Sequence, residues 1–416
     1  MNREHIDIAV IGGGCAGLSA ALAAKENGAD SIVIFERSAY LGGVLRQCIH
    51  NGFGIHRFGE DLTGTQYARR LTDALAKANI CCVTDTIVLN ISQNRTVTAM
   101  NRDGITEYEA KAVIIATGCR ERARGALLIP GSRPAGVVTA GTAQRYMNID
   151  GYLVGKRIVI LGSGDIGLIM ARQFVLEGAE VIAVAEVMPY SGGLMRNIVQ
   201  CVEDFDIPLY YRTTVTRIVG EKRVEGVYLA EVNEQRQPIA TTERFVACDT
   251  LVLSVGLIPE NELAADADIT VSPITGGPVV DDMFMTSAEG IFACGNALHV
   301  HDLVDFVSLE SERAGRNAAR YAAGERGTSR AGLIEVQDGP GVRGVVPQRI
   351  YRSGGDDTIT LQFRPDAKYI NHLVSVWSGG ARIAQKKYRV LTPGEMCEIQ
   401  VRRIDIRGTV CVQAED

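Results

Sequence analysis

The sequence predicts an α/β protein with two domains built on parallel βαβ units, followed by a small all-β domain. Three observations predict this class: a glycine-rich βαβ pattern near the start, a second copy of that pattern, and a final stretch of short alternating strands. The 416 residues suggest two or three domains, and 46% hydrophobic with 22% charged residues is typical of a globular protein.

The first βαβ unit covers residues 6–36. Residues 6–11 predict a buried parallel strand, residues 18–27 a helix, and residues 31–35 a second strand that ends at Glu36. Between the first strand and the helix lies GGGCAG (12–17), a G-x-G-x-x-G motif. Gly12 permits the tight turn, Gly14 lets a pyrophosphate approach the backbone, and Gly17 lets the helix pack closely. The helix N-terminus would bind the phosphates and Glu36 a ribose. The alternative is a glycine turn in an ordinary βαβ unit.

The segment after Glu36 carries a loop, a helix and a meander. Residues 45–54 predict an irregular stretch that is rich in reactive side chains, and residues 62–79 predict an amphipathic helix. Residues 80–110 predict a β-meander with turns at 93–94 and 103–104. A buried strand at 112–116 then ends at Thr117-Gly118.

The second unit repeats the first. Residues 157–161 predict a strand, GSGDIG (162–167) is a second G-x-G-x-x-G motif, residues 168–177 predict a helix, and the strand at 181–185 ends at Glu186. A meander at 209–245 and a strand at 250–255 follow, ending at Gly256. Because one unit would hold one dinucleotide, two units predict two different ones.

The rest of the chain completes the three-domain prediction. After Cys294-Gly295-Asn296, residues 309–323 predict a helix and residues 324–332 a linker. Residues 333–416 predict a small all-β domain with strands at 358–363, 373–377, 381–388 and 398–404. The predicted fold class is therefore two Rossmann-like, three-layer ββα dinucleotide-binding domains plus a C-terminal all-β domain.

Charge and cysteine usage exclude several classes of protein. A net charge of −6 without a basic tail argues against nucleic acid as the main partner. Neither a signal peptide nor an apolar run long enough to span a bilayer is predicted. The ten cysteines make no C-x-x-C motif, so neither a zinc ribbon nor a thioredoxin-type redox pair is predicted. No metal site is predicted. Scattered cysteines fit a reducing cytoplasm.

The order of five motifs over about residues 5–325 resembles the FAD/NAD(P)-dependent pyridine nucleotide-disulfide oxidoreductase superfamily, with a thioredoxin-reductase-like core. Four segments also resemble FAD-dependent subunits that are associated with anaerobic-type glycerol-3-phosphate dehydrogenases, to which subunits of amine- and opine-oxidising complexes are related. These segments are GGVLRQCIHNGFG (42–54), ATGCRERARG (116–125), IPGSRPAGVVTAGTAQR (129–145) and CGNALHVHDLVD (294–305).

The resemblance implies FAD on the first unit and NAD(P)H on the second. It implies a discontinuous FAD domain at 1–120 and 246–328, a nicotinamide domain at 121–245, and a β domain at 333–416 that makes subunit contacts. The implied FAD contacts are Gly12, Gly14, Cys15, Ala16, Gly17, Glu36, Arg37, Gly43, Val88, Thr117, Gly118, Gly295 and Asn296. The implied nicotinamide-cofactor contacts are Gly162, Gly164, Asp165, Ile166, Gly167, Glu186 and Gly256.

Three features depart from the family pattern. Asn296 replaces the Asp that binds the flavin ribityl chain, but its side chain keeps an acceptor oxygen. Glu186 falls one residue after the usual ribose-binding acid, and no arginine cluster follows it, which favours NADH over NADPH. Only Cys48 follows Gly43, so neither redox-cysteine pair of the family is present.

Two side chains are candidates for chemistry beyond cofactor binding. Cys48 would act as a thiolate or sulfenic acid near the flavin, or else be an inert buried cysteine. His301, together with His299, would stabilise an anionic reduced flavin, or else cap a helix or make a core hydrogen bond. The Arg120–Arg124 run would be a solvated crossover, or else bind a partner or an anionic substrate.

Three functions are compatible with these motifs. The leading hypothesis is an NADH-linked FAD oxidoreductase that relays electrons to or from a partner dehydrogenase within an oligomer, with glycerol 3-phosphate as a candidate substrate of that partner. The second is a stand-alone NADH oxidase or peroxidase that uses Cys48. The third is a non-enzymatic flavoprotein scaffold.

Overall fold

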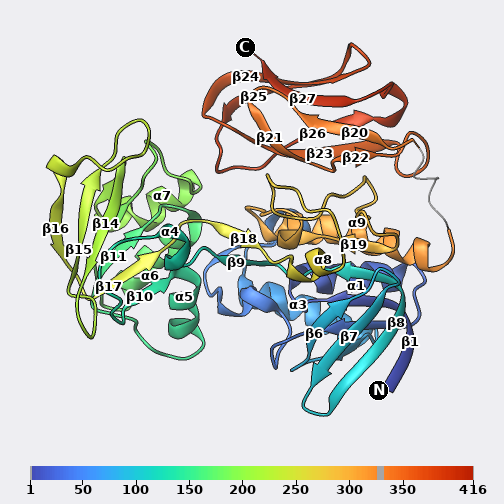
Figure 1. The fold of residues 1–416 in the computed structure, drawn as a ribbon, viewed down its shortest axis with the longest axis horizontal. Coiled ribbons are helices and arrows are strands. Elements are labelled where there is room, and N and C mark those ends of the chain that lie inside the picture. The colour runs from blue at the N-terminus through green and yellow to red at the C-terminus, as the bar shows by residue number, and fades with distance from the viewer. Residues whose placement is uncertain (1, 326–331, 416) are drawn as a thin grey trace. The chain divides into compact units, whose positions relative to one another are not determined.

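The computed structural model describes residues 2–325 and 332–415, which form two compact units (Figure 1). The first unit combines residues 1–119 and 259–416, and the second is the continuous segment 120–258. Strands β9 (Cys119–Glu121) and β18 (Leu257–Pro259) carry the chain between the units and pair with each other. The predicted domain end at 328 and most of the predicted linker fall on residues 326–331, outside the described residues.

The first unit is built on a seven-stranded sheet in the order β5-β2-β1-β8-β7-β6, with β19 beside β8. The strands β5, β2, β1, β8 and β19 run parallel, whereas β6 and β7 form an antiparallel meander on β8. Ala9 and Val10 of β1, which point to opposite faces of the sheet, are fully buried, as expected for a strand covered on both faces. The strand bounds are β1 Asn2–Ile11, β2 Ile32–Phe35, β5 Cys81–Val83, β6 Ile87–Ile91, β7 Thr96–Asn101, β8 Gly104–Ile115 and β19 Ile291–Ala293.

Helices α1 and α9, far apart in the sequence, pack on each other in this unit (Figure 1). Their backbones approach so closely that a Cβ on Gly315 would lie 2.0 Å from the carbonyl oxygen of Ala20. Helix α3 begins with a capping box between Thr63 and Gln66. The bounds are α1 Cys15–Glu26, α2 Ile55–Phe58, α3 Gly64–Lys77, α8 Glu262–Asp266 and α9 Val304–Ala322, with short elements η1 Gly43–Gln47, β3 Asn51–Phe53, β4 Leu62–Thr63 and η4 Gly295–Ala297.

The second unit repeats this plan with a five-stranded parallel sheet, β10-β17-β11-β12-β13, and a separate antiparallel sheet, β14-β15-β16. Its core includes Ile158 and Ile160 of β11 and Leu168 and Phe174 of α6, all fully buried. The bounds are α4 Arg124–Leu127, β10 Val137–Thr139, α5 Ala140–Asn148, β11 Arg157–Leu161, α6 Asp165–Leu176, β12 Glu180–Ala185, α7 Met195–Cys201, η2 Glu203–Phe205, β13 Leu209–Tyr210, β14 Thr213–Val219, β15 Gly226–Glu231, η3 Ala240–Thr242, β16 Arg244–Ala247 and β17 Thr250–Leu253.

The C-terminal part of the first unit is β-rich, with sheets β22-β20-β27-β24-β25 and β21-β23-β26 around a separate core. Alternate residues of β23, namely Ile359, Leu361 and Phe363, point into this core. The bounds are β20 Ile334–Asp338, β21 Val342–Val346, β22 Arg349–Ile350, β23 Thr358–Pro365, β24 Tyr369–Ser378, β25 Ala381–Leu391, β26 Cys397–Arg402, η5 Arg403–Asp405 and β27 Val410–Glu415.

The predicted fold class is confirmed, with several corrections to its parts. Residues 246–258 belong to the second unit, because β17 pairs with β10 and β11. Strands β5 and β13 extend the parallel sheets rather than opening the meanders. The end of the predicted meander, up to residue 110, and the predicted buried strand at 112–116 form one strand, β8. Helix α9 begins at Val304 rather than at residue 309. No described helix is both long and apolar enough to cross a membrane.

Candidate functional site

The first glycine turn has no room for side chains at its two structural glycines. Gly12 has φ +111°, and a Cβ on it would lie 2.3 Å from the carbonyl oxygen of Ala116. A Cβ on Gly17 would lie 1.9 Å from the carbonyl oxygen of Gly12. Both contacts are with backbone atoms, which cannot move aside. Gly12 and Gly17 therefore have the structural roles that the motif predicts.

Gly14 is different, because the chain leaves open space beside it. A Cβ on Gly14 would meet only the Cα of Gly43, 4.0 Å away. Gly14 is also the N-cap of α1, with no side chain capping the helix and no acidic residue in its first turn. The N-terminus that begins at Cys15 and Ala16 therefore keeps the positive end of its dipole available. Gly295 is brought to the same place, since a Cβ on it would lie 2.7 Å from the Cβ of Ala16.

Glu36 is bound to the glycine turn on one side and to the following loop on the other. Its Oε2 accepts a hydrogen bond from the backbone N–H of Gly13 at 2.8 Å, and its Oε1 accepts one from Ser38 at 2.8 Å. The carboxylate is buried but keeps further lone pairs, so it is fixed in position with capacity to accept from a ribose. Arg37 is largely exposed and pairs with Glu260 at 3.4 Å.

The second turn reproduces this geometry. Gly162 has φ +100° and its Cβ would lie 2.0 Å from the Ser254 carbonyl oxygen, whereas a Cβ on Gly167 would lie 2.7 Å from the Ser254 Cβ. Gly164 has open space, with the nearest atom to a Cβ being the Ser254 Oγ at 3.7 Å. Gly256 has φ +101° and accepts a hydrogen bond from the N–H of Arg122 at 2.9 Å.

Glu186 occupies the same place in the second unit as Glu36 in the first. Its Oε2 accepts hydrogen bonds from the N–H and Oγ of Ser163 at 2.9 and 2.7 Å, and its Oε1 accepts one from the N–H of Met188 at 2.8 Å. The sequence placed Glu186 one residue after the usual ribose-binding position. In the structure Glu186 and Glu36 hold equivalent positions, because each carboxylate accepts a hydrogen bond from the second residue of its own glycine motif.

The sequence-based reasoning missed how far the internal repeat extends. ERSAYLGG (36–43) and EVMPYSGG (186–193) match at a constant offset, and each loop returns to its own glycine turn. The N–H of Gly42 donates to the Gly13 carbonyl at 2.8 Å, and Ser191 Oγ donates to the Ser163 carbonyl at 2.8 Å. Aligning the chain against itself past Glu186 would have revealed these loops.

Asp165 and Ile166 begin helix α6, but Asp165 is committed to another contact. Its Oδ1 accepts hydrogen bonds from the N–H of Leu194 at 2.8 Å and from Asn197 Nδ2 at 2.6 Å. The carboxylate therefore anchors the segment that leads into α7. The half-buried Ile166 packs against the core of this unit.

The segments at 117–118 and 295–296 lie beside each other in the first unit. Asn296 Oδ1 accepts a hydrogen bond from the N–H of His301 at 3.0 Å, and its Nδ2 lies 3.5 Å from the Cys119 sulfur. Thr117 Oγ1 donates to the Glu260 carbonyl at 2.6 Å, and Gly118 accepts from the Glu260 N–H at 2.9 Å. The Asn296 amide oxygen thus already has one partner, where the sequence suggested a flavin contact.

Val88 is buried in β6 opposite Ala99 and belongs to the hydrophobic core. Thr86, two residues before Val88, contacts the end of the second strand, because its N–H donates to the Glu36 carbonyl at 3.0 Å. Thr213 makes the same bond to Glu186 at 2.9 Å, so this contact is also part of the repeat.

Cys48 is a buried thiol rather than a thiolate. Burial, with a smaller effect of the nearby Cys15, raises the pKa of Cys48 to about 12. Its Sγ donates a hydrogen bond to the Val44 carbonyl at 3.4 Å. Because the nucleophile is the thiolate, these observations favour the inert-cysteine interpretation over a redox role. None of the ten cysteines forms a disulfide.

His301 is buried beside His299 and Glu310. Burial lowers the pKa of His301 to about 3, against the smaller opposing effect of Glu310. His299 Nε2 lies 2.6 Å from Glu310 Oε2, and Glu310 Oε1 accepts a hydrogen bond from the Gly295 N–H at 2.8 Å. A neutral imidazole cannot stabilise an anion by its charge, so the predicted imidazolium role of His301 is not supported.

The β-rich part of the first unit binds residues 300–302, the segment that contains His301. Arg364 of β23 donates to the Val300 carbonyl at 3.0 Å and to Asp302 Oδ1 at 2.5 Å, and also to the Gly394 carbonyl at 2.6 Å. Asp302 Oδ2 accepts from the N–H of Met396 at 2.6 Å. The predicted subunit-contact role of this β domain stays a prediction, but the domain clearly holds residues 300–302.

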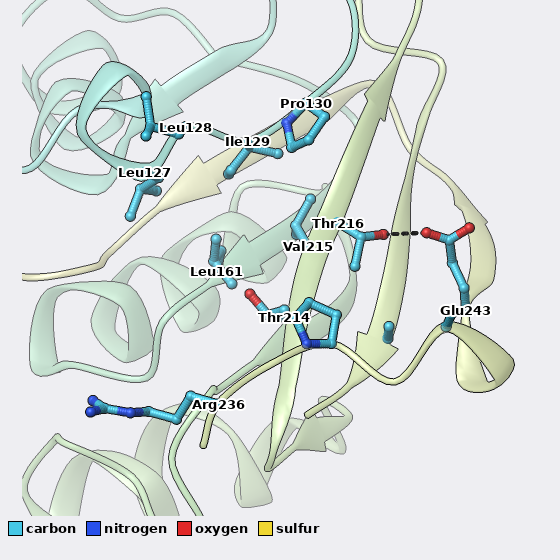
Figure 2. Close-up of a pocket in the computed structure, with 13 residues that line it drawn as sticks. Leu127, Leu128, Ile129, Pro130, Leu161, Thr214, Val215, Thr216, Arg236 and Glu243 are labelled. Carbon is cyan, nitrogen blue, oxygen red and sulfur yellow. Dashed lines mark hydrogen bonds between the residues drawn. The ribbon is translucent and has the colours of Figure 1, made fainter. Parts of the chain in front are cut away.

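A cavity of about 480 Å³ lies in the second unit, and none of the predicted cofactor contacts lines it (Figure 2). It is lined mainly by the crossover segment 127–130, strand β14 and the loop 236–243. Thr216 Oγ1 donates to Glu243 Oε1 at 2.6 Å at one side of it. Leu161, which precedes the second glycine motif, is the lining residue nearest in sequence to a predicted contact.

Comparison with known proteins places this geometry in a family. The chain is similar to an opine oxidase subunit of Agrobacterium tumefaciens (strain Ach5), with 25% identity over 315 residues, covering 70% of this chain and 61% of that protein. It is similar to the ferredoxin reductase component of chlorobenzene dioxygenase of Cupriavidus sp. (strain PS12), with 29% identity over 225 residues, covering 50% of each chain. The chain thus spans about half to three fifths of the length of these curated relatives.

The fold matches solved structures as well. The crystal structure of T. acidophilum thioredoxin reductase superimposes with a TM-score of 0.64 at 24% identity, covering 78% of this chain and 100% of that one. The family model described as pyridine nucleotide-disulphide oxidoreductase matches residues 6–371, which include both glycine turns. The chain therefore belongs to the pyridine nucleotide-disulphide oxidoreductase family.

Proposed function

We propose that this chain is an FAD-dependent NAD(P)H oxidoreductase that holds FAD on the first unit and a nicotinamide dinucleotide on the second. The single observation that carries the proposal is the duplicated glycine turn, in which each unit has an unobstructed glycine beside a helix N-terminus and a fixed carboxylate. Members of this family are FAD-dependent oxidoreductases, which supports the same reading. When bound, the two cofactors supply a two-electron hydride transfer.

The residues of the first turn fit a flavin dinucleotide. Gly14 leaves open space beside the uncapped N-terminus of α1, since only the Gly43 Cα lies as near as 4.0 Å to an added Cβ, and a pyrophosphate would approach the backbone there. Glu36 is preset to accept from a ribose, and Gly295 and Asn296 lie at the same helix end. The other implied contacts, including Arg37, Val88 and Thr117-Gly118, remain proposals on the family resemblance.

We favour NADH over NADPH for the second turn. Glu186 presents a carboxylate at the ribose position, and the three residues after it, Val187, Met188 and Pro189, carry no positive charge. A carboxylate there accepts from a 2′-hydroxyl and repels a 2′-phosphate. Asp165, at the first position of α6, adds negative charge at the phosphate-binding end, but its oxygen is bonded to Leu194 and Asn197.

Two matched substitutions test these assignments separately. Gly14→Ala and Gly164→Ala each place a Cβ at least 3.7 Å from any protein atom, so neither should disturb the fold. The purified full chain is titrated anaerobically with NADH and NADPH while its flavin absorbance is recorded. We expect Gly14→Ala to lose FAD, and Gly164→Ala to keep FAD but to require at least about tenfold more NADH for bleaching.

Three results would overturn the proposal. The first is a wild-type protein that stays colourless after refolding with FAD. The second is bound flavin that NADH and NADPH both fail to bleach, which would favour a scaffold. The third is unchanged NADH bleaching in Gly164→Ala. Equal bleaching by NADPH would overturn the NADH preference alone.

We further propose that the chain is an electron-transfer subunit of a dehydrogenase complex, with glycerol 3-phosphate as the candidate substrate of the partner. The resemblance of four segments supports this, as does similarity to proteins named as a reductase component and an oxidase subunit. The buried Cys48 thiol removes the main support for a stand-alone oxidase. Purifying the chain from its native cells tests the proposal: co-purification of a dehydrogenase that reduces the flavin with glycerol 3-phosphate is expected. Fast NADH oxidation by the lone chain would contradict it.

A further inference from the structure

We propose that His299, His301 and Glu310 form a binding site for one divalent transition-metal ion, with Zn²⁺ as the best fit. Their ligand atoms all lie within 4.8 Å of one another, and all three residues are buried. The cluster joins the segment after β19 to the second turn of helix α9. Its function would be structural, holding Gly295 and the residues after it in place.

The ring of His301 presents a nitrogen without a hydrogen-bond partner to the Glu310 carboxylate. His301 Nδ1 lies 3.2 Å from the carbonyl oxygen of His299, and a carbonyl can only accept, so Nδ1 carries a proton. His301 Nε2 lies 3.3 Å from Glu310 Oε2 but makes no hydrogen bond. Two acceptor atoms thus face each other in a side chain that is 1% exposed. A cation between them would bind both lone pairs.

The surroundings also match those of known metal sites. A metal-bound histidine usually donates its other N–H to a carbonyl or carboxylate, as His301 does to His299. A metal-bound carboxylate is usually held by a hydrogen bond, as Glu310 Oε1 is by the Gly295 N–H at 2.8 Å. These contacts fix both ligands before any ion binds.

The ligand set selects the class of ion. Two imidazole nitrogens and one carboxylate oxygen suit Zn²⁺ and its neighbours, whereas Ca²⁺ and Mg²⁺ prefer oxygen ligands only. His299 Nε2 and Glu310 Oε2 are 2.6 Å apart, within hydrogen-bond distance. A bound ion would replace this hydrogen bond and move the two atoms apart to about 3.4 Å, since Zn–N and Zn–O bonds are about 2.1 Å and meet at the tetrahedral angle.

The test measures metal content, so its outcome does not depend on NADH activity. The tag-free full chain is stripped with a chelator, loaded with Zn²⁺ or Co²⁺, desalted and assayed by mass spectrometry and by the visible spectrum of Co²⁺. We compare the wild type with His301→Gln and with the matched control His5→Gln, an exposed histidine 78% accessible at its side chain. About one ion per chain is expected for wild type and His5→Gln, with an affinity at least about 100-fold lower for His301→Gln.

The Co²⁺ spectrum of the wild type tests the site even if His301→Gln folds poorly. A wild-type spectrum typical of low-coordinate nitrogen and oxygen ligation supports the site without any variant. The proposal is overturned if the wild type retains no ion after desalting. It is also overturned if His301→Gln retains as much as the wild type, which would indicate an adventitious ion only.

Discussion

A Cβ atom on Gly17 would lie 1.9 Å from the Gly12 carbonyl oxygen, well inside van der Waals contact. Helix α1 would have to shift away from β1, which would open the turn. We predict that Gly17→Ala lowers the free energy of unfolding by about 1–3 kcal/mol. Gly125→Ala in α4 is the control, because its Cβ meets no atom within 4 Å and should be neutral or slightly stabilising. Urea denaturation of both variants measures this, and equal stabilities would contradict it.

Asp281 provides a test that depends on pH. Burial, with a smaller effect of Asp282, raises the pKa of Asp281 to about 7. A raised folded-state pKa contributes stability that is complete below the unfolded value of 3.8 and is lost as pH rises through about 7. Asn at this position keeps the oxygen that accepts from the N–H groups of Met283 and Met285 at 2.9 and 3.0 Å.

We therefore predict that Asp281→Asn stabilises the protein at pH 8 by up to about 4 kcal/mol and has little effect near pH 4. The exposed Asp266→Asn is the control and should change stability little at either pH. Thermal melts at several pH values measure the difference. A stabilisation that does not depend on pH would show that packing, and not ionisation, is responsible.

Single residues of the site were predictable where the motif dictates backbone geometry. Gly12 and Gly17 follow from the turn alone, and Glu36 and Glu186 follow from the strand ends. The sequence left two roles open for Cys48 and for His301, because their chemistry depends on burial, which no local pattern reveals. Helix α9 must begin as early as Val304 to bring Glu310 beside His299 and His301. The polar residues after Val304 hid this early start from the sequence pattern.

At the scale of elements, the periodic segments were predicted well and the short connecting ones were not. Helices α1 and α6 and the strands before and after them match the predicted pattern within a few residues. Helices α5 and α7 were missed because each is short and only its tertiary contacts stabilise it. Strand β8 was divided in two because its first half is half-exposed and its second half is buried.

Arg364 of strand β23 joins two segments of the first unit. This side chain donates hydrogen bonds to residues 300–302 and to the carbonyls of residues 393–394. Its loss would therefore release the β-rich part from residues 300–302. We predict that Arg364→Ala lowers the free energy of unfolding by about 2–3 kcal/mol. This is less than the cost of breaking a fully buried ion pair, because Arg364 and Asp302 are partly exposed. Arg343→Ala, an exposed residue of β21, is the control.

Hydrogen exchange distinguishes this effect from a general loss of stability. Faster exchange confined to residues 298–303 and 393–397 is expected for Arg364→Ala. Uniformly faster exchange over the whole first unit would mean that Arg364 does not hold this segment specifically.

At the scale of the whole molecule, the second unit is continuous in sequence and has its own cores. We predict that a fragment of residues 120–258 folds by itself, unfolds cooperatively with urea, and binds NADH without flavin. Circular dichroism and nicotinamide fluorescence measure these properties. A fragment that lacks a cooperative transition would show that the second unit depends on the first for its stability.

The insertion of one unit within the other also governs how the protein is made. Strand β8 ends at Ile115, but its parallel neighbour β19 begins only at Ile291, after the entire second unit. At synthesis rates of roughly 5–20 residues per second, a ribosome needs about 9–35 s to bridge that gap. A nascent chain must therefore wait with an incomplete sheet edge while its inserted segment emerges and folds. During that interval chaperones, rather than the flavin, would have to shield the growing polypeptide.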